Sequence, residues 1–131
     1  MTTDGGRQPQ KLTSRARGPS VVREFPMATP EDVLDKCRTT LERLYGRQFK
    51  GLVLYGSMAR GQAVLASDID LLVLLNQPFD YFDELRRIVD ALYPIQLESE
   101  QLISAKPARL EDYERGRIQL YRNARREGRF V

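Results

Sequence analysis

The sequence contains no histidine and only one cysteine, Cys37. The lack of histidine excludes Ser-His-Asp and Cys-His catalysis, together with every histidine-ligated metal site. A single cysteine excludes an internal disulfide and provides no cluster for a structural zinc ion. Any chemistry in this chain therefore depends on carboxylates, hydroxyls, cations or a bound metal.

Long apolar runs are absent as well. No stretch reaches the length of a transmembrane helix, and the N-terminus lacks the apolar region of a secretory signal. With 41% hydrophobic and 30% charged residues among 131, the composition is that of a soluble protein with one modest core. We expect a cytoplasmic protein that does not interact with membranes.

The net charge of +3 is confined to the N-terminal segment. Residues 1–27 carry five basic and two acidic side chains, whereas residues 28–131 carry 16 of each. The first segment is poor in large apolar residues, so we expect a flexible basic tail over 1–27 and one domain over 28–131. A neutral domain lacks the basic face that a polynucleotide requires, so we do not expect it to bind nucleic acid directly. Residues 109–129, with seven arginines and four acids, suit either a solvated helix face or a surface for an acidic partner.

The apolar pattern predicts three helices and three strands. Thr29 and Asp80 are suitable helix caps, and Pro94 is expected to end the second helix. The expected elements are a helix over 29–45, strands over 51–55 and 69–75, a helix over 80–93, a strand over 95–104 and a helix over 111–127. This order predicts an α/β domain with a small mixed β-sheet flanked by helices.

Two aspartates, Asp68 and Asp70, lead into the apolar run 71–75. On a strand, alternate residues share a face, so the two carboxylates point the same way from positions roughly 6.5 Å apart. Two divalent cations about 3.5 to 4 Å apart fit between such carboxylates and a phosphate. The same residues also fit a capped loop in which both acids are solvated and hold no metal.

A possible phosphate-binding turn, Gly56-Ser57, precedes this pair at the end of the first strand. Glycine lets the backbone approach a ligand closely, and N–H groups exposed in a turn bind phosphate. Ser57 adds a hydroxyl donor, and Arg60 adds a cation that suits a triphosphate. An ordinary turn followed by a surface arginine has the same composition, so the aspartate pair gives the motif its specificity.

Together, Gly56-Ser57-x-x-Arg60-Gly61 and the segment 67–73 closely resemble the signature of the polymerase-β-type nucleotidyltransferase superfamily. The small size and the ending 122–128 resemble the minimal nucleotidyltransferases (MNT), often encoded beside a HEPN-domain protein as a toxin–antitoxin pair. The resemblance implies the polymerase-β-type nucleotidyltransferase fold, ATP as substrate and two Mg²⁺ ions.

The resemblance also implies a third carboxylate on a neighbouring strand. Glu98 and Glu100 share one face of the expected third strand, so periodicity does not distinguish them. Similarity around Leu97-Glu98 to small family members favours Glu98. The alternative for both glutamates is the solvated face of an edge strand.

By resemblance, Asp68, Asp70 and Glu98 hold the metal ions, and Gly56, Ser57 and Arg60 bind the triphosphate. The expected reaction is transfer of AMP from ATP to a protein hydroxyl, a tyrosine of a HEPN toxin, which makes the protein an antitoxin. One alternative is a catalytically silent protein that neutralises its partner by binding alone. Another is a small-molecule nucleotidyltransferase of the aminoglycoside type.

Overall fold

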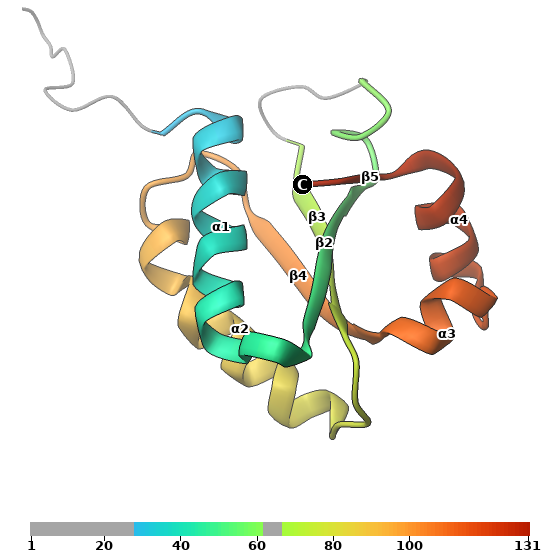
Figure 1. Cartoon of the computed structure of the whole chain (residues 1–131). Coiled ribbons are helices and arrows are strands. Elements are labelled where there is room, and N and C mark those ends of the chain that lie inside the picture. Colours follow the sequence, from blue (N-terminus) through green and yellow to red (C-terminus); the bar gives the residue numbers. More distant parts are fainter. Residues whose placement is uncertain (1–27, 62–66) are drawn as a thin grey trace, which may run out of the picture.

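A four-stranded mixed sheet lies between two pairs of helices in the computed structural model, which describes residues 28–61 and 67–131 (Figure 1). The strand order is β4-β3-β2-β5; β2 is antiparallel to both of its neighbours, whereas β3 and β4 are parallel. The predicted α/β class with a small mixed sheet is confirmed. The elements are α1 (Pro30–Tyr45), the 3-10 turn η2 (Gly46–Gln48), β2 (Phe49–Tyr55), β3 (Ile69–Leu75), α2 (Tyr81–Gln96), β4 (Ile103–Arg109), α3 (Leu110–Arg115), α4 (Gln119–Glu127) and β5 (Arg129–Phe130).

Strand β3 is at the centre of the core because both of its faces are covered. Leu71, Val73 and Leu75 pack with α1 and α2 on one side, and Leu72 and Leu74 pack toward α3 and α4 on the other. All five side chains are at most 2% exposed. A strand buried on both faces needs a continuous apolar run, which is the pattern found in the sequence.

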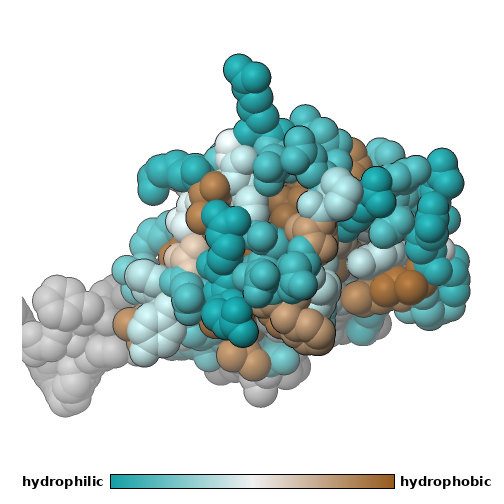
Figure 2. Space-filling view, turned by 90° about the horizontal axis from the view of Figure 1, so that it is seen from below, coloured by the Kyte–Doolittle hydropathy of each residue, from teal (hydrophilic) through white to brown (hydrophobic). Residues whose placement is uncertain are grey.

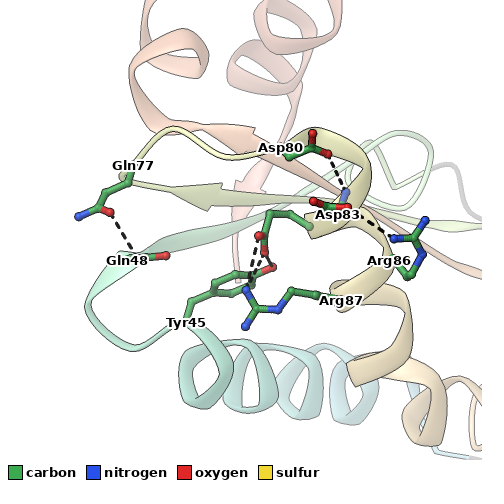
Figure 3. Close-up of polar contacts among 8 residues, drawn as sticks. Tyr45, Gln48, Gln77, Asp80, Asp83, Arg86 and Arg87 are labelled. Atoms are coloured by element: carbon green, nitrogen blue, oxygen red, sulfur yellow. Dashed lines mark hydrogen bonds and ion pairs between the residues drawn. The ribbon is translucent and has the colours of Figure 1, made fainter.

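Helices α1 and α2 begin at the predicted caps. The Thr29 side chain accepts a hydrogen bond from the Asp32 N–H, and the Asp80 side chain accepts one from the Asp83 N–H. Near the start of α2, the Tyr45 hydroxyl donates to Glu84 at 2.9 Å (Figure 3). The Tyr45–Glu84 hydrogen bond connects the end of α1 to the start of α2.

The predicted third strand over 95–104 is wrong, because the helix does not end at Pro94. Helix α2 continues to Gln96, and the strand β4 begins only at Ile103. The side chain of Gln96 donates to the carbonyl of Gln101 and accepts from the N–H of Ile103, while the hydroxyl of Ser99 bonds with both backbone groups of Gln101. These hydrogen bonds hold residues 97–102 in a turn, which satisfies backbone groups that a strand would have paired.

The predicted last helix is divided in two. Helix α3 ends at Arg115 because Gly116 adopts φ +63, a left-handed conformation that caps the helix, and α4 starts at Gln119. The short strand β5 was not predicted. It pairs with β2, and the next residue, Val131, donates its N–H to the Leu52 carbonyl at 2.9 Å.

Helix α2 keeps several apolar side chains at the surface. Tyr81, Phe82, Val89 and Tyr93 are between 37% and 71% exposed. Seen from below, apolar patches interrupt a largely hydrophilic face of the molecule (Figure 2).

Among the described residues, none of the helices is both long and apolar enough to cross a membrane. The predicted tail over 1–27 lies outside the described residues.

Candidate active site

The predicted turn at the end of β2 starts at a glycine that the geometry requires. Gly56 has φ +78, a conformation that side-chain-bearing residues rarely adopt. Its carbonyl accepts a hydrogen bond from the Arg60 N–H at 3.2 Å, and the Met58 carbonyl accepts one from the Gly61 N–H at 3.3 Å. A Cβ atom at Gly56 would overlap the carboxylate of Asp70. The turn and the carboxylate therefore pack directly against each other.

Asp70 is the second residue of β3 and lies opposite Tyr55, the residue before this turn. Asp70 is half-buried and Asp68 is exposed. Burial raises the pKa of Asp70 above its ordinary value, and the negative charge of Asp68 raises it further, whereas Lys106 and Arg60 act in the opposite direction. The two carboxylates are thus close enough to repel each other, and a shared cation would relieve that repulsion.

The side chain of Tyr55 belongs to the same region. Its pKa is raised to about 12, mainly by burial and then by the negative charge of Asp70. The phenol consequently stays protonated at neutral pH and keeps its O–H as a hydrogen-bond donor beside the carboxylate.

Arg60 lies at the edge of the carboxylate pair and contacts the C-terminal helix. Its guanidinium forms an ion pair with Glu127 of α4 at 3.2 Å and helps to lower the pKa of Asp70. Ser57 is half-buried in the turn after Gly56. The structure therefore brings together Gly56, Ser57, Arg60, Asp68 and Asp70, from segments before and after residues 62–66.

Glu98 is not part of this group. It lies in the turn after α2, on no strand, and its carboxylate accepts a hydrogen bond from Lys36 of α1 at 2.6 Å. Glu100 lies in the same turn. Over residues 28–61 and 67–131, no three acidic, histidine or cysteine side chains are grouped so that they could hold a metal ion. The expected trio of Asp68, Asp70 and a third-strand glutamate is therefore not formed, because the strand lies eight residues later than predicted.

The comparison with protein families gives a match to the nucleotidyltransferase domain over residues 34–120. This interval is more than half of the chain and contains the Gly56 turn and both aspartates. The chain belongs to the nucleotidyltransferase domain family. Among solved structures, it is similar to a chain in the crystal structure of a mutant of the toxin–antitoxin MntA-HpeT, with 18% identity, 79% of this chain and 72% of that chain covered, and a TM-score of 0.46. No curated protein matches.

In this nucleotidyltransferase domain, β4 brings a serine and a lysine beside Asp70, whereas the sequence analysis expected a glutamate from the neighbouring strand. Asp70 pairs with Ser104, and Leu72 pairs with Lys106. Ser104 and Lys106 share the face of β4 that lies beside Asp70, and the Lys106 ammonium donates to the Ser104 hydroxyl at 3.3 Å. The alternation of polar and apolar residues in 103–106 is the signal that could have identified this face.

The donor set fits one magnesium ion. Mg²⁺ binds oxygen ligands and is commonly held in proteins by one or two carboxylates together with the phosphates of the substrate. Asp68 and Asp70 provide the carboxylates, and the Gly56 turn provides backbone beside them to meet phosphate. A bound Mg²⁺ would neutralise charge on the triphosphate and polarise the phosphorus–oxygen bonds.

Proposed function

We propose that this nucleotidyltransferase domain transfers AMP from ATP to a hydroxyl group of a partner protein, a tyrosine of a HEPN toxin, and thereby acts as an antitoxin. The observation that carries the proposal is the packing of Asp70 against Gly56, with Asp68 close enough to affect its pKa. A carboxylate pair of the kind that holds Mg²⁺ beside a turn suited to phosphate supports the proposal.

In the proposed reaction, the acceptor hydroxyl oxygen attacks the α-phosphorus of ATP. The bond from this phosphorus to the bridging oxygen of the β-phosphate breaks, pyrophosphate leaves, and the hydroxyl proton is released to solvent. Gly56 and Ser57 donate hydrogen bonds to the phosphates, and Arg60 counters the charge that develops on pyrophosphate. Asp68 and Asp70 hold the magnesium ion that accompanies ATP.

A protein acceptor is favoured over a polynucleotide by the charge of the domain. Residues 28–131 carry equal numbers of basic and acidic side chains. Several arginines near the C-terminus are already paired within the chain: Arg109 and Arg115 with Glu111, Arg117 with Asp112 and Arg126 with Glu127. These pairs leave little concentrated positive charge for a phosphate backbone.

The apolar surface of α2 also supports a protein partner. A groove of about 270 Å³ lies between α2 and β4 and is lined in part by Val89, Tyr93 and Leu102, each more than half exposed. Exposed apolar patches with polar rims are typical of surfaces that bind other proteins. The motif and size that resemble the MNT group support a HEPN toxin as this partner.

Lys106 favours a second candidate function. A catalytically silent member of the family, which neutralises its partner by binding alone, would keep the fold while losing part of the metal-binding acid set. The ammonium of Lys106 beside Asp70, and the ion pair of Glu98 with Lys36 of α1, are the observations that favour it.

Incubation with labelled ATP, Mg²⁺ and a candidate HEPN-domain partner protein separates the two functions. Label on the partner that disappears in Asp70→Asn, but persists in the matched control Asp90→Asn on the exposed face of α2, supports the transferase. The loss in Asp70→Asn should be on the order of a thousandfold. A tight complex without label would support the silent binder.

A further inference from the structure

The ammonium of Lys106 lies close to the carboxylate that is expected to hold metal. The Cα of Lys106 is opposite Leu72, but its side chain bends back by two residues to reach the hydroxyl of Ser104 at 3.3 Å. Ser104 is the β4 residue paired with Asp70, and neighbouring strands are about 4.8 Å apart. The positive charge is therefore held beside Asp70, and Lys106 is half-buried there.

The ligands and charges around the pair suit one divalent cation better than two. Asp68 and Asp70 contribute two negative charges, and Lys106 contributes one positive charge next to them. Arg60 is near as well, although its guanidinium also pairs with Glu127. A second Mg²⁺ would need a protein carboxylate besides the phosphate oxygens, but over residues 28–61 and 67–131 no third acid joins Asp68 and Asp70, and the ammonium of Lys106 beside Asp70 would repel that ion. Like charges at such distances repel strongly in a partly desolvated site.

We propose that this site holds a single divalent cation and that the ammonium of Lys106 takes the place of a second one beside Asp70 and the triphosphate. The inference deepens the proposed function and rests on it, since both concern the same nucleotide site. It replaces the expectation of two Mg²⁺ ions. A lysine ammonium binds phosphate as a point charge, so it neutralises triphosphate charge without requiring protein ligands of its own.

The test counts bound Mn²⁺ by electron paramagnetic resonance, in the presence of a non-hydrolysable ATP analogue. The wild-type protein should bind about one Mn²⁺ per chain. Lys106→Asp, which replaces the ammonium with a carboxylate, should bind about two and show magnetic coupling between neighbouring ions, which lie about 3.5 to 4 Å apart in two-metal sites. The matched control Lys50→Asp makes the same change of charge at an exposed residue near the other end of β2 and should bind about one.

A neutral variant keeps the test decisive if Lys106→Asp does not fold. Lys106→Gln removes the positive charge without adding a ligand, and circular dichroism checks its fold. Titrated with Mn²⁺ alone, it should still bind one ion, with an affinity about tenfold higher than that of the wild type, because a nearby positive charge has been removed. Unchanged or weaker Mn²⁺ binding by Lys106→Gln would overturn the proposal.

The outcomes distinguish this inference from the proposed function. Two Mn²⁺ ions in the wild type, with transfer of label intact, would overturn the single-cation site and leave the transferase standing. One ion in both the wild type and a folded Lys106→Asp would overturn the role given to Lys106. Absence of Mn²⁺ binding by the wild type, with and without nucleotide, would overturn both the inference and the proposed function.

Discussion

Replacing Gly56 by alanine adds a single methyl group against the Asp70 carboxylate. The φ of +78 at this position costs an L-residue about 1–2 kcal/mol. The added Cβ overlaps one carboxylate oxygen and lies 3.3 Å from the carboxyl carbon, so the turn or the side chain must move. Overpacking of this kind costs about 1–3 kcal/mol. We therefore expect Gly56→Ala to lower the free energy of unfolding by about 2–5 kcal/mol in total.

Gly61→Ala is the matched control, because it separates backbone strain from the contact with Asp70. Gly61 has φ +71, close to that of Gly56, but within the described part of the chain a Cβ there meets no atom beyond its neighbours within 4 Å. Its substitution should cost only the strain of about 1–2 kcal/mol. Urea unfolding followed by circular dichroism measures both variants, and the difference between them reports the Asp70 contact.

The same pair of variants tests the site itself. A shift of about 1 Å in a positioning group costs on the order of a hundredfold in rate, so Gly56→Ala should transfer label to the partner protein about a hundredfold more slowly than Gly61→Ala. Equal losses of stability and rate in the two variants would refute the role of the Asp70 contact. Full transfer by a folded Gly56→Ala would refute the proposed site.

Three further predictions concern charge and packing. Without Mg²⁺, Asp70→Asn should be more stable than the wild type at neutral pH, because burial raises the pKa of Asp70 in the folded protein above 3.8 and its ionisation therefore destabilises the fold. The gain in the free energy of unfolding should vanish below pH 3.8, where the carboxyl group is protonated in both states. No gain at neutral pH would contradict the burial of Asp70. Glu98→Gln should leave transfer of label essentially unchanged, because Glu98 pairs with the exposed Lys36 instead of joining the aspartates; a large loss of activity would show that Glu98 reaches the site. Gly128→Ala should lower the free energy of unfolding by about 1–3 kcal/mol, because a Cβ at this position would meet the backbone oxygen of Leu54. Urea unfolding measures the change. A stability equal to that of the wild type would show that β5 does not need a glycine close to the backbone of β2.

Local signals in the sequence predicted the first part of the fold well. The cap at Thr29 and the apolar run of β3 are short-range features, and the structure has α1 and β3 where these features placed them. The Gly56 turn and the aspartate pair were also predicted as candidate site residues. Their mutual contact follows from the antiparallel pairing of β2 with β3, which aligns Tyr55 with Asp70.

Long-range features were not visible in the sequence. The apolar and polar residues over 95–104 fit a strand, but side-chain hydrogen bonds from Gln96 and Ser99 stabilise a turn in this segment. The parallel register that places Ser104 and Lys106 beside Asp70 depends on how β4 aligns with β3 in space. Periodicity shows which residues share a face, whereas the partner opposite each residue depends on the register.

Binding of a fluorescent ATP analogue, measured by anisotropy with and without Mg²⁺, tests directly whether Asp68, Asp70 and the Gly56 turn form the nucleotide site. We expect the wild type and Asp90→Asn to bind the analogue in a Mg²⁺-dependent manner and Asp70→Asn to lose this binding. Equal binding by Asp70→Asn, or binding by the wild type that is unchanged when EDTA removes the metal, would contradict the claim that Asp68, Asp70 and the Gly56 turn form the nucleotide site.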